Sequence, residues 1–301
     1  MAISSNTLRT VAMPMGMVVG ALLCRPVMWV DAAARGWLTP SLISLMLFFT
    51  FCRVDARNIK FSWMHLWLIL FQVVGSVAIY YAFAAWNVVV AQGAMICILA
   101  PVAMAAVVIG GMLGANIETM AAYSLMCNFI IAMLSPMFLH HLGNGECTMI
   151  QILQRVAPML IAPFVAGQVC RFALPSVAGW VSRHSFLSFY IWLVSLVVII
   201  GRTTCFLIDH KANRAVEFML AVVALAICLL QFKVGRAIGR RYGDAAAGGQ
   251  SLGQKNTVLA VWLSQAFLDP VSSVAPTAYI VWQNLVNSYQ IYRTGKEPKS
   301  R

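Results

Sequence analysis

The residues most suited to chemistry are polar side chains that open an otherwise apolar segment near the C-terminus. In the run GGQSLGQKNTVLAVWLSQAFLDP, Lys255 stands between Gln254 and Asn256, and Ser251 precedes it by one helical turn. An ammonium at the centre of a bilayer costs about 2.5 to 3.5 kcal/mol, so a lysine within a membrane segment requires a compensating reason. The same polar start would also fit the simple entry of a helix at the membrane surface.

A second polar group lies in the last apolar segment, in the run VWQNLVNSYQ. Asn284, Asn287 and Ser288 are spaced at i, i+3 and i+4, which places them on one face of a helix. Such a face either makes hydrogen bonds to neighbouring helices or lines a cavity. The sequence leaves both roles open.

The sequence carries no pattern that points to an enzyme. It lacks HExxH and Walker-type runs and an intramembrane pair of aspartates. The cysteines have no CxxC or metal-ligand spacing and are interpreted as buried, inert thiols. The five histidines share no helix face, so we expect neither a metal nor a cofactor.

The elements that must position these residues are apolar segments of membrane-spanning length. Of 301 residues, 61% are hydrophobic and 10% are charged, with a mean hydropathy of +0.82. Soluble domains carry about a quarter charged residues, so we predict an all-α integral membrane protein, with residues 1–301 forming a single transmembrane domain. A spanning helix needs about 20 mostly apolar residues. Ten approximate segments result: 9–29, 36–52, 62–84, 87–113, 116–139, 150–171, 185–205, 214–234, 251–268 and 271–292.

The net charge of +12 is explained better by membrane topology than by binding to a polyanionic partner. The basic residues are scattered singly between apolar segments, which argues against nucleic acid. With the N-terminus inside, the positive-inside rule predicts a multi-pass protein of the cytoplasmic (inner or plasma) membrane with both termini in the cytoplasm. The inside set is Arg9, Arg53, Arg57, Lys60, Arg171, Arg183, Lys233, Arg236, Arg240, Arg241, Arg293, Lys296, Lys299 and Arg301; the outside set is Arg25, Arg35, Arg155, Arg202, Lys211 and Arg214; Lys255 remains within a span.

Two short segments indicate an internal repeat. The run VVGALLCR ends at Arg25 and the run FVAGQVCR ends at Arg171, and the two share Val, Cys and Arg at one fixed offset. Each opens a series of five spans, so the second series enters the bilayer from the opposite side. We therefore predict two inverted five-helix repeats, 9–140 and 150–293, an arrangement common in secondary transporters.

In inverted-repeat transporters the binding site is typically built where one span of each half loses its helix. The fourth span contains Pro101, which cannot continue an ideal helix. The ninth begins with the polar run around Lys255. The Gly-rich half of residues 233–250 is predicted to be a flexible connection, and Asn116, Glu118 and Asp269 to be capping or turn residues.

At these two places the sequence resembles the bile acid:sodium symporter family. The run GQKNTVLAV resembles the family's Gly-Met-Gln-Asn-Ser-Gly-Leu-Ala-Val run, and VWQNLVNS resembles its Val-Trp-His-Asn-x-x-Gly-Ser run. Supporting matches are LMLFFTF in the second span, Gln72, Pro101, GAN ending at Asn116, and the Pro163, Gly167 and Arg171 pattern. The similarity extends over nearly the whole chain.

The resemblance implies ten helices in a panel domain (spans 1, 2, 6 and 7) and a core domain (spans 3 to 5 and 8 to 10), with spans 4 and 9 broken where they cross. It also implies secondary transport of an organic anion by alternating access, which most members couple to two sodium ions.

The chain resembles a divergent, bacterial-type member that departs from the family at most of its sodium ligands. Where sodium-coupled members have Ser and Asn after the fourth-span proline, this chain has Ala106 and Val107, and Met120 and Ser124 stand where the fifth span has two hydroxyls. Ser251 and Lys255 replace a Glu and a Gln. Of the side-chain ligands, Gln72 and Ser124 remain. Because sodium, like other hard cations, takes oxygen ligands, the departures make sodium doubtful.

Our hypothesis is that the Lys255 ammonium takes the place of a sodium ion. In one variant it stays protonated as a counter-charge for a bile-acid-like or small carboxylate anion; in the other it exchanges a proton, coupling transport to protons. The alternatives are a lysine that snorkels to the interface and a non-transporting sensor or partner subunit on a transporter scaffold. The expected partners are the bilayer, a small organic anion and protons, with no expectation for oligomeric state.

Overall fold

The computed structural model describes residues 5–53, 61–103, 105–143, 148–184, 186–209 and 213–296. These residues form α-helices and one short 3-10 helix, and no β-strand occurs among them. Arg57, Lys60, Lys211, Lys299 and Arg301, which entered the count of basic residues, lie outside the described part.

Five helices are long and apolar enough to cross a membrane: α4 (Trp63–Ala84), α7 (Ile117–Leu142), α8 (Met149–Ala173), most of α10 (Phe186–Asp209) and α11 (Arg214–Arg241). The bent pair α1 (Ser5–Leu22) and α2 (Cys24–Ala33) is a sixth candidate span. The protein is thus helical, with helices that can span a membrane. Fewer than ten pass because α3 (Leu38–Arg53) has only 16 residues, two predicted spans are split into shorter helices and α14 (Val274–Lys296) is too polar.

The first predicted span, 9–29, is not one helix. Its two parts, α1 and α2, are bent by 76° at Leu23. Pro26 explains the position of the bend. A proline lacks the N–H for an intrahelical bond, and its ring clashes with the carbonyl four residues earlier, here that of Leu22, where α1 ends.

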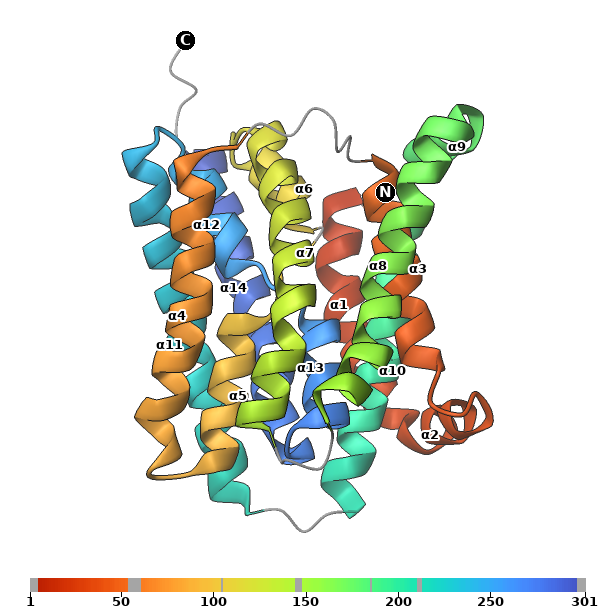
Figure 1. The fold of residues 1–301 in the computed structure, drawn as a ribbon, viewed down its shortest axis with the longest axis vertical. Coiled ribbons are helices and arrows are strands. Elements are labelled where there is room, and N and C mark those ends of the chain that lie inside the picture. Colours follow the sequence, from red (N-terminus) through yellow and green to blue (C-terminus); the bar gives the residue numbers. More distant parts are fainter. Residues whose placement is uncertain are drawn as a thin grey trace. The chain divides into compact units, whose positions relative to one another are not determined.

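The chain divides into two compact units, each built from two stretches of sequence. Unit 1 comprises Met1–Asp55 and Arg155–Ala212, and unit 2 comprises Ala56–Gln154 and Asn213–Arg301. Unit 1 therefore contains α1, α2, α3 (Leu38–Arg53), most of α8, α9 (Pro175–Arg183) and α10. Figure 1 shows both stretches of each unit by their colours.

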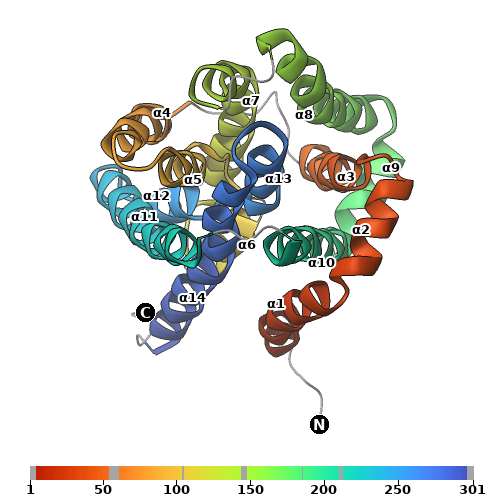
Figure 2. The ribbon, with the colours of Figure 1, turned by 90° about the horizontal axis from the view of Figure 1, so that it is seen from below.

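Within unit 1, α10 lies beside α1, α2 and α3 (Figure 2). The close approach of α1 depends on Gly20, because a Cβ there would meet the Val197 carbonyl oxygen at 2.6 Å. Arg202 of α10 forms an ion pair with Asp31 of α2 at 3.2 Å. The two side chains are only 20% and 10% exposed.

Unit 2 shows how short polar residues set helix starts. Ser62, Asn87, Asn116, Asn213, Asp244, Asn256 and Asp269 each accept a hydrogen bond from a backbone N–H of the turn that follows. Such caps satisfy amides that have no partner inside the helix. The capping role predicted for Asn116 is confirmed, and Asp269, predicted to be a turn residue, caps the short 3-10 helix Pro270–Ser273.

α5 (Val88–Leu99) lies in the middle of unit 2, in contact with α4, α7, α11, α13 (Thr257–Phe267) and α14 (Figure 2). Its Val90, Ala94 and Cys97 belong to a buried apolar cluster with residues of α11 and α14. A buried, multiply contacted α5 gives its C-terminal end a defined place in the unit.

The prediction of a flexible connection in the Gly-rich segment was wrong. Residues Ala245–Gly253 form a buried helix, α12, that packs along α11. A Cβ on Gly248 would collide with the Gly235 carbonyl oxygen, and one on Gly235 with that of Gly248. The glycines serve close helix packing, as small residues do between membrane helices, rather than flexibility.

Candidate binding site at two broken helices

The first break separates α5 from α6 (Ala105–Met112). Pro101 has no N–H, and its ring is incompatible with a helical bond to the Cys97 carbonyl. A residue before proline is also driven to extended conformations, and Ala100 has φ −50° and ψ 136°. The helix therefore ends at Leu99, as the predicted break at Pro101 requires.

The second break separates α12 from α13 without a proline. Gln254 is extended, with φ −92° and ψ 96°. The Asn256 side chain accepts from the Leu259 amide at 3.2 Å and so starts α13. The polar residues that open the predicted ninth span thus lie between two half-length helices.

The two breaks pair with each other. Val102 and Lys255 form an isolated antiparallel bridge. Ala103 N donates to the Gln254 carbonyl at 2.9 Å, and Asn256 N donates to the Pro101 carbonyl at 2.8 Å. Non-helical backbone within a membrane protein must find partners inside the protein, and here each break supplies them to the other.

The C-terminal end of α5 presents four carbonyls that the helix cannot satisfy. After the last helical bond, from Ala100 N to Ile96 O, three side chains serve the next four carbonyls. Gln231 Nε2 donates to Cys97 O at 3.1 Å, Lys255 Nζ to Ile98 O at 2.8 Å, and Gln72 Nε2 to both Leu99 O and Ala100 O at 2.8 Å. The broken end is therefore fully capped by side chains from α4, α11 and the second break.

Lys255 is the charged member of this cap. It is 1% exposed, and its ammonium binds the carbonyl end of α5, where the helix dipole favours positive charge. Within the described residues no carboxylate pairs with it. Because the side chain is turned inward onto Ile98, the snorkelling alternative does not describe this structure.

A network of amides from α12 and α14 supports the second break. Gln283 Oε1 accepts from Lys255 N at 3.0 Å. Asn287 Nδ2 donates to Gln254 Oε1 at 2.6 Å, and Gln250 Nε2 donates to Asn287 Oδ1 at 2.9 Å and to Gln290 Oε1 at 3.2 Å. The inward face of α14 is therefore Gln283, Asn287 and Gln290.

This arrangement corrects the predicted face of α14. Asn284 is half-buried and donates to the Ile280 carbonyl of its own helix at 2.7 Å, and Ser288 is exposed. Of the three residues assigned to one face, only Asn287 reaches the break. Spacings of i, i+4 and i+7 describe a helix face as well as i, i+3 and i+4 do, and packing selected the former.

The remaining predicted site residues contribute no hydrogen bond across the break. Ala106 is fully buried and Val107 is half-buried, both in the first turn of α6. The Oγ atoms of Ser124 and Ser251 are buried and have no hydrogen-bond partner among the described residues. No group of three or more His, Cys, Asp or Glu side chains that could hold a metal lies in that part of the chain.

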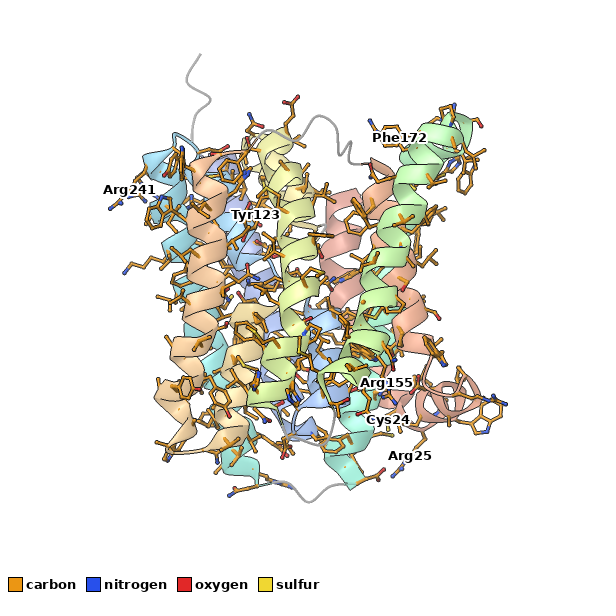
Figure 3. The ribbon with its side chains drawn as sticks, viewed as in Figure 1. Cys24, Arg25, Tyr123, Arg155, Phe172 and Arg241 are labelled. Atoms are coloured by element: carbon orange, nitrogen blue, oxygen red, sulfur yellow. The ribbon has the colours of Figure 1, made fainter. Side chains whose placement is uncertain are left out.

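Sequence reasoning missed Gln250 and four other residues that hold the breaks in place: Tyr123, Tyr279, Asn128 and Gln231. Tyr123, labelled in Figure 3, donates to Gln72 Oε1 at 3.1 Å, and Tyr279 donates to Gly253 O at 2.9 Å and accepts from Gln231 Nε2 at 3.0 Å. Asn128 Nδ2 donates to Val102 O at 3.3 Å. Gln231 and Asn128 carried a usable signal, because buried amides in membrane helices require partners.

No family model matches the chain, and no curated protein sequence matches it.

Proposed function

We propose that this chain is a sodium-independent secondary transporter that carries a small organic anion by alternating access. The observation that carries the proposal is Lys255, a buried ammonium at the crossing of two broken helices. Among the described residues, the ammonium has the neutral Ile98 carbonyl as its hydrogen-bond partner. A charge so placed costs stability, and a role in transport is the compensating reason.

The ammonium has the surroundings of a bound cation. It contacts a carbonyl oxygen at the negative end of α5, while Gln72 satisfies the next two carbonyls. In the bile acid:sodium symporter family, which the sequence resembles, this crossing recruits sodium. We propose that Lys255 supplies the same charge covalently, so that no ion is needed.

The choice of an anion rests on the helix starts at the crossing. α6 begins at Ala105 and α13 at Thr257, each directly after a break. Helix N-termini carry partial positive charge, which favours anions. Bile-acid-like and small carboxylates are therefore the substrate class of the proposal.

The proposal includes ten spans in two inverted repeats, with both termini at the cytoplasmic side of the membrane. It is supported by the composition of the two units. Unit 1 unites the stretches that hold predicted spans 1, 2, 6 and 7, and unit 2 those that hold spans 3 to 5 and 8 to 10. These are the panel and core sets of the resemblance.

The test is uptake of radiolabelled organic anions into proteoliposomes by wild type and Lys255→Gln, with sodium or choline outside. We expect wild-type uptake that is equal in both salts and is lost in the variant. Lys233→Gln is the matched control, because Lys233 lies exposed on α11. Sodium-dependent wild-type uptake, or uptake that survives Lys255→Gln, would overturn the proposal. A failure of every anion tested would favour a non-transporting sensor or partner subunit.

A proton-coupled carrier is the second candidate, favoured by the lack of a carboxylate beside Lys255 within the described residues. A buried ammonium without a counter-ion is stabilised by losing its proton, so a cycle of protonation is available to it. Uptake driven by an imposed pH gradient and abolished by a protonophore would identify this coupling, whereas exchange or facilitated transport would proceed without the gradient.

A further inference from the structure

Unit 1 contains two pairs of cysteines whose side chains are neighbours in the fold. Cys24 at the start of α2 pairs with Cys205 on α10, and Cys52 on α3 pairs with Cys170 on α8. All four are buried and none is in a disulfide. The partners of each pair are far apart in sequence, so the fold alone brings them together.

Glycines produce the close contact in each pair. Gly201 lies on α10 one helical turn before Cys205, and a Cβ there would lie 3.0 Å from Val27 Cβ on α2. Gly167 lies one turn before Cys170, and a Cβ there would lie 3.0 Å from Cys52 N. The thiols thus sit on pairs of helices whose backbones nearly touch.

The pairs occupy opposite ends of unit 1. Beside the first, Arg25 and Asp209 form an exposed ion pair at 2.6 Å; beside the second, Arg171 donates to the Cys52 carbonyl at 3.4 Å. Figure 3 labels Cys24 at one end and Phe172, two residues after Cys170, at the other. Cys24 and Cys170 also hold matching places in the two proposed repeats.

We propose that both pairs are dithiol sites that hydroperoxides convert to disulfides. Cys24 and Cys170, each 6% exposed against 1% for its partner, are the thiols attacked first. The sulfur attacks hydrogen peroxide, the O–O bond breaks, and a sulfenic acid and water form. The partner thiol then displaces the hydroxyl as a second water, so two thiols and one peroxide give one disulfide and two waters.

The contact geometry suits this step and gives these four cysteines an alternative to the inert role predicted from the sequence. A disulfide needs sulfurs about 2.05 Å apart on closely spaced backbones, and neighbouring thiols on closely packed helices can reach this by side-chain rotation. Each bond would join two helices of unit 1, α2 to α10 and α3 to α8. The inference does not depend on the transport proposal.

The test is peroxide treatment of the full-length protein in membranes, followed by alkylation of free thiols, digestion and mass spectrometry. We expect two linked peptides, Cys24 with Cys205 and Cys52 with Cys170, that disappear on reduction with dithiothreitol. Cys97 and Cys228 are the internal control. They share the apolar cluster of unit 2, but the neighbour of the Cys228 thiol is Tyr279. Both thiols should therefore stay free during peroxide treatment and be alkylated afterwards.

A variant arm separates the pair from general reactivity. In Cys205→Ser, Cys24 should stop at the sulfenic acid and be labelled by dimedone, while the Cys52 pair still closes. Full alkylation of all four thiols in peroxide-treated wild type would overturn the proposal, as would linkage of Cys97 with Cys228 to an equal extent. The wild-type arm decides the matter even if the variant does not fold.

Discussion

Lys255→Met is the substitution that best separates stability from function. Methionine keeps most of the length of the side chain while removing its charge and its donor, so two opposing effects act at the break. The Ile98 carbonyl, which Lys255 Nζ binds at 2.8 Å, loses its donor. At the same time the buried, unpaired charge disappears.

The two effects have known sizes. An orphaned buried acceptor costs about 1 to 3 kcal/mol, and the charge at the centre of a span costs about 2.5 to 3.5 kcal/mol. The variant should therefore differ from wild type by between about −0.5 and +2.5 kcal/mol. At roughly 2 to 4 °C per kcal/mol for a domain of 150 to 250 residues, we expect a Tm between about 2 °C lower and 10 °C higher.

The assay combines thermal unfolding in detergent with uptake in proteoliposomes. We expect Lys255→Met to be as stable as wild type or more so, and to lose uptake, because a residue kept at a cost in stability is kept for function. Lys233→Met, on the exposed side of α11, should change neither. A Tm lower by more than about 6 °C, or undiminished uptake, would refute the reasoning and make Lys255 a structural residue.

Four further outcomes test the structure. Wild type should show the same Tm in sodium and in choline, whereas sodium bound at 100 times its Kd would add about 2.7 kcal/mol; a sodium-specific rise contradicts the tethered-cation hypothesis. Gln72→Leu should lower the free energy of unfolding by about 2 kcal/mol or more, because two carbonyls lose their donor. Gln154→Leu, at an exposed position, is the control. Equal effects of the two substitutions would count against the cap. Gly248→Ala should destabilise the protein by about 1 to 3 kcal/mol through overpacking. Gly179→Ala, with nothing within 4 Å of its Cβ, should be neutral or stabilising. The reverse order would contradict the α11–α12 packing. Arg202→Gln should lower the free energy of unfolding by about 3 kcal/mol, because it leaves Asp31 unpaired. Arg25→Gln should lower it by less than about 1 kcal/mol, because its ion pair is exposed. Similar values for the two variants in chemical denaturation would argue against this ranking.

Local signals in the sequence were sufficient for most helix boundaries. The apolar composition predicted helices of membrane length, and Pro101 marked a helix end because its ring and missing N–H act within one turn. The capping role of Asn116 could likewise be predicted, since a cap binds amides two or three residues away. The bend at Leu23 was missed although Pro26 carried the same local signal.

The contacts that make the site were decided by the tertiary structure. Periodicity shows that Gln283, Asn287 and Gln290 share a face but not that this face meets Gln250 and Gln254. Likewise nothing local indicates that α5 ends against Gln72, Gln231 and Lys255, or that four cysteines form two pairs. The sequence by itself determined a helical membrane protein with an expensive lysine at a polar break. Only the packing of distant helices determined where that lysine's charge is placed, because unsatisfied carbonyls and close glycine contacts arise between segments that are far apart in the chain.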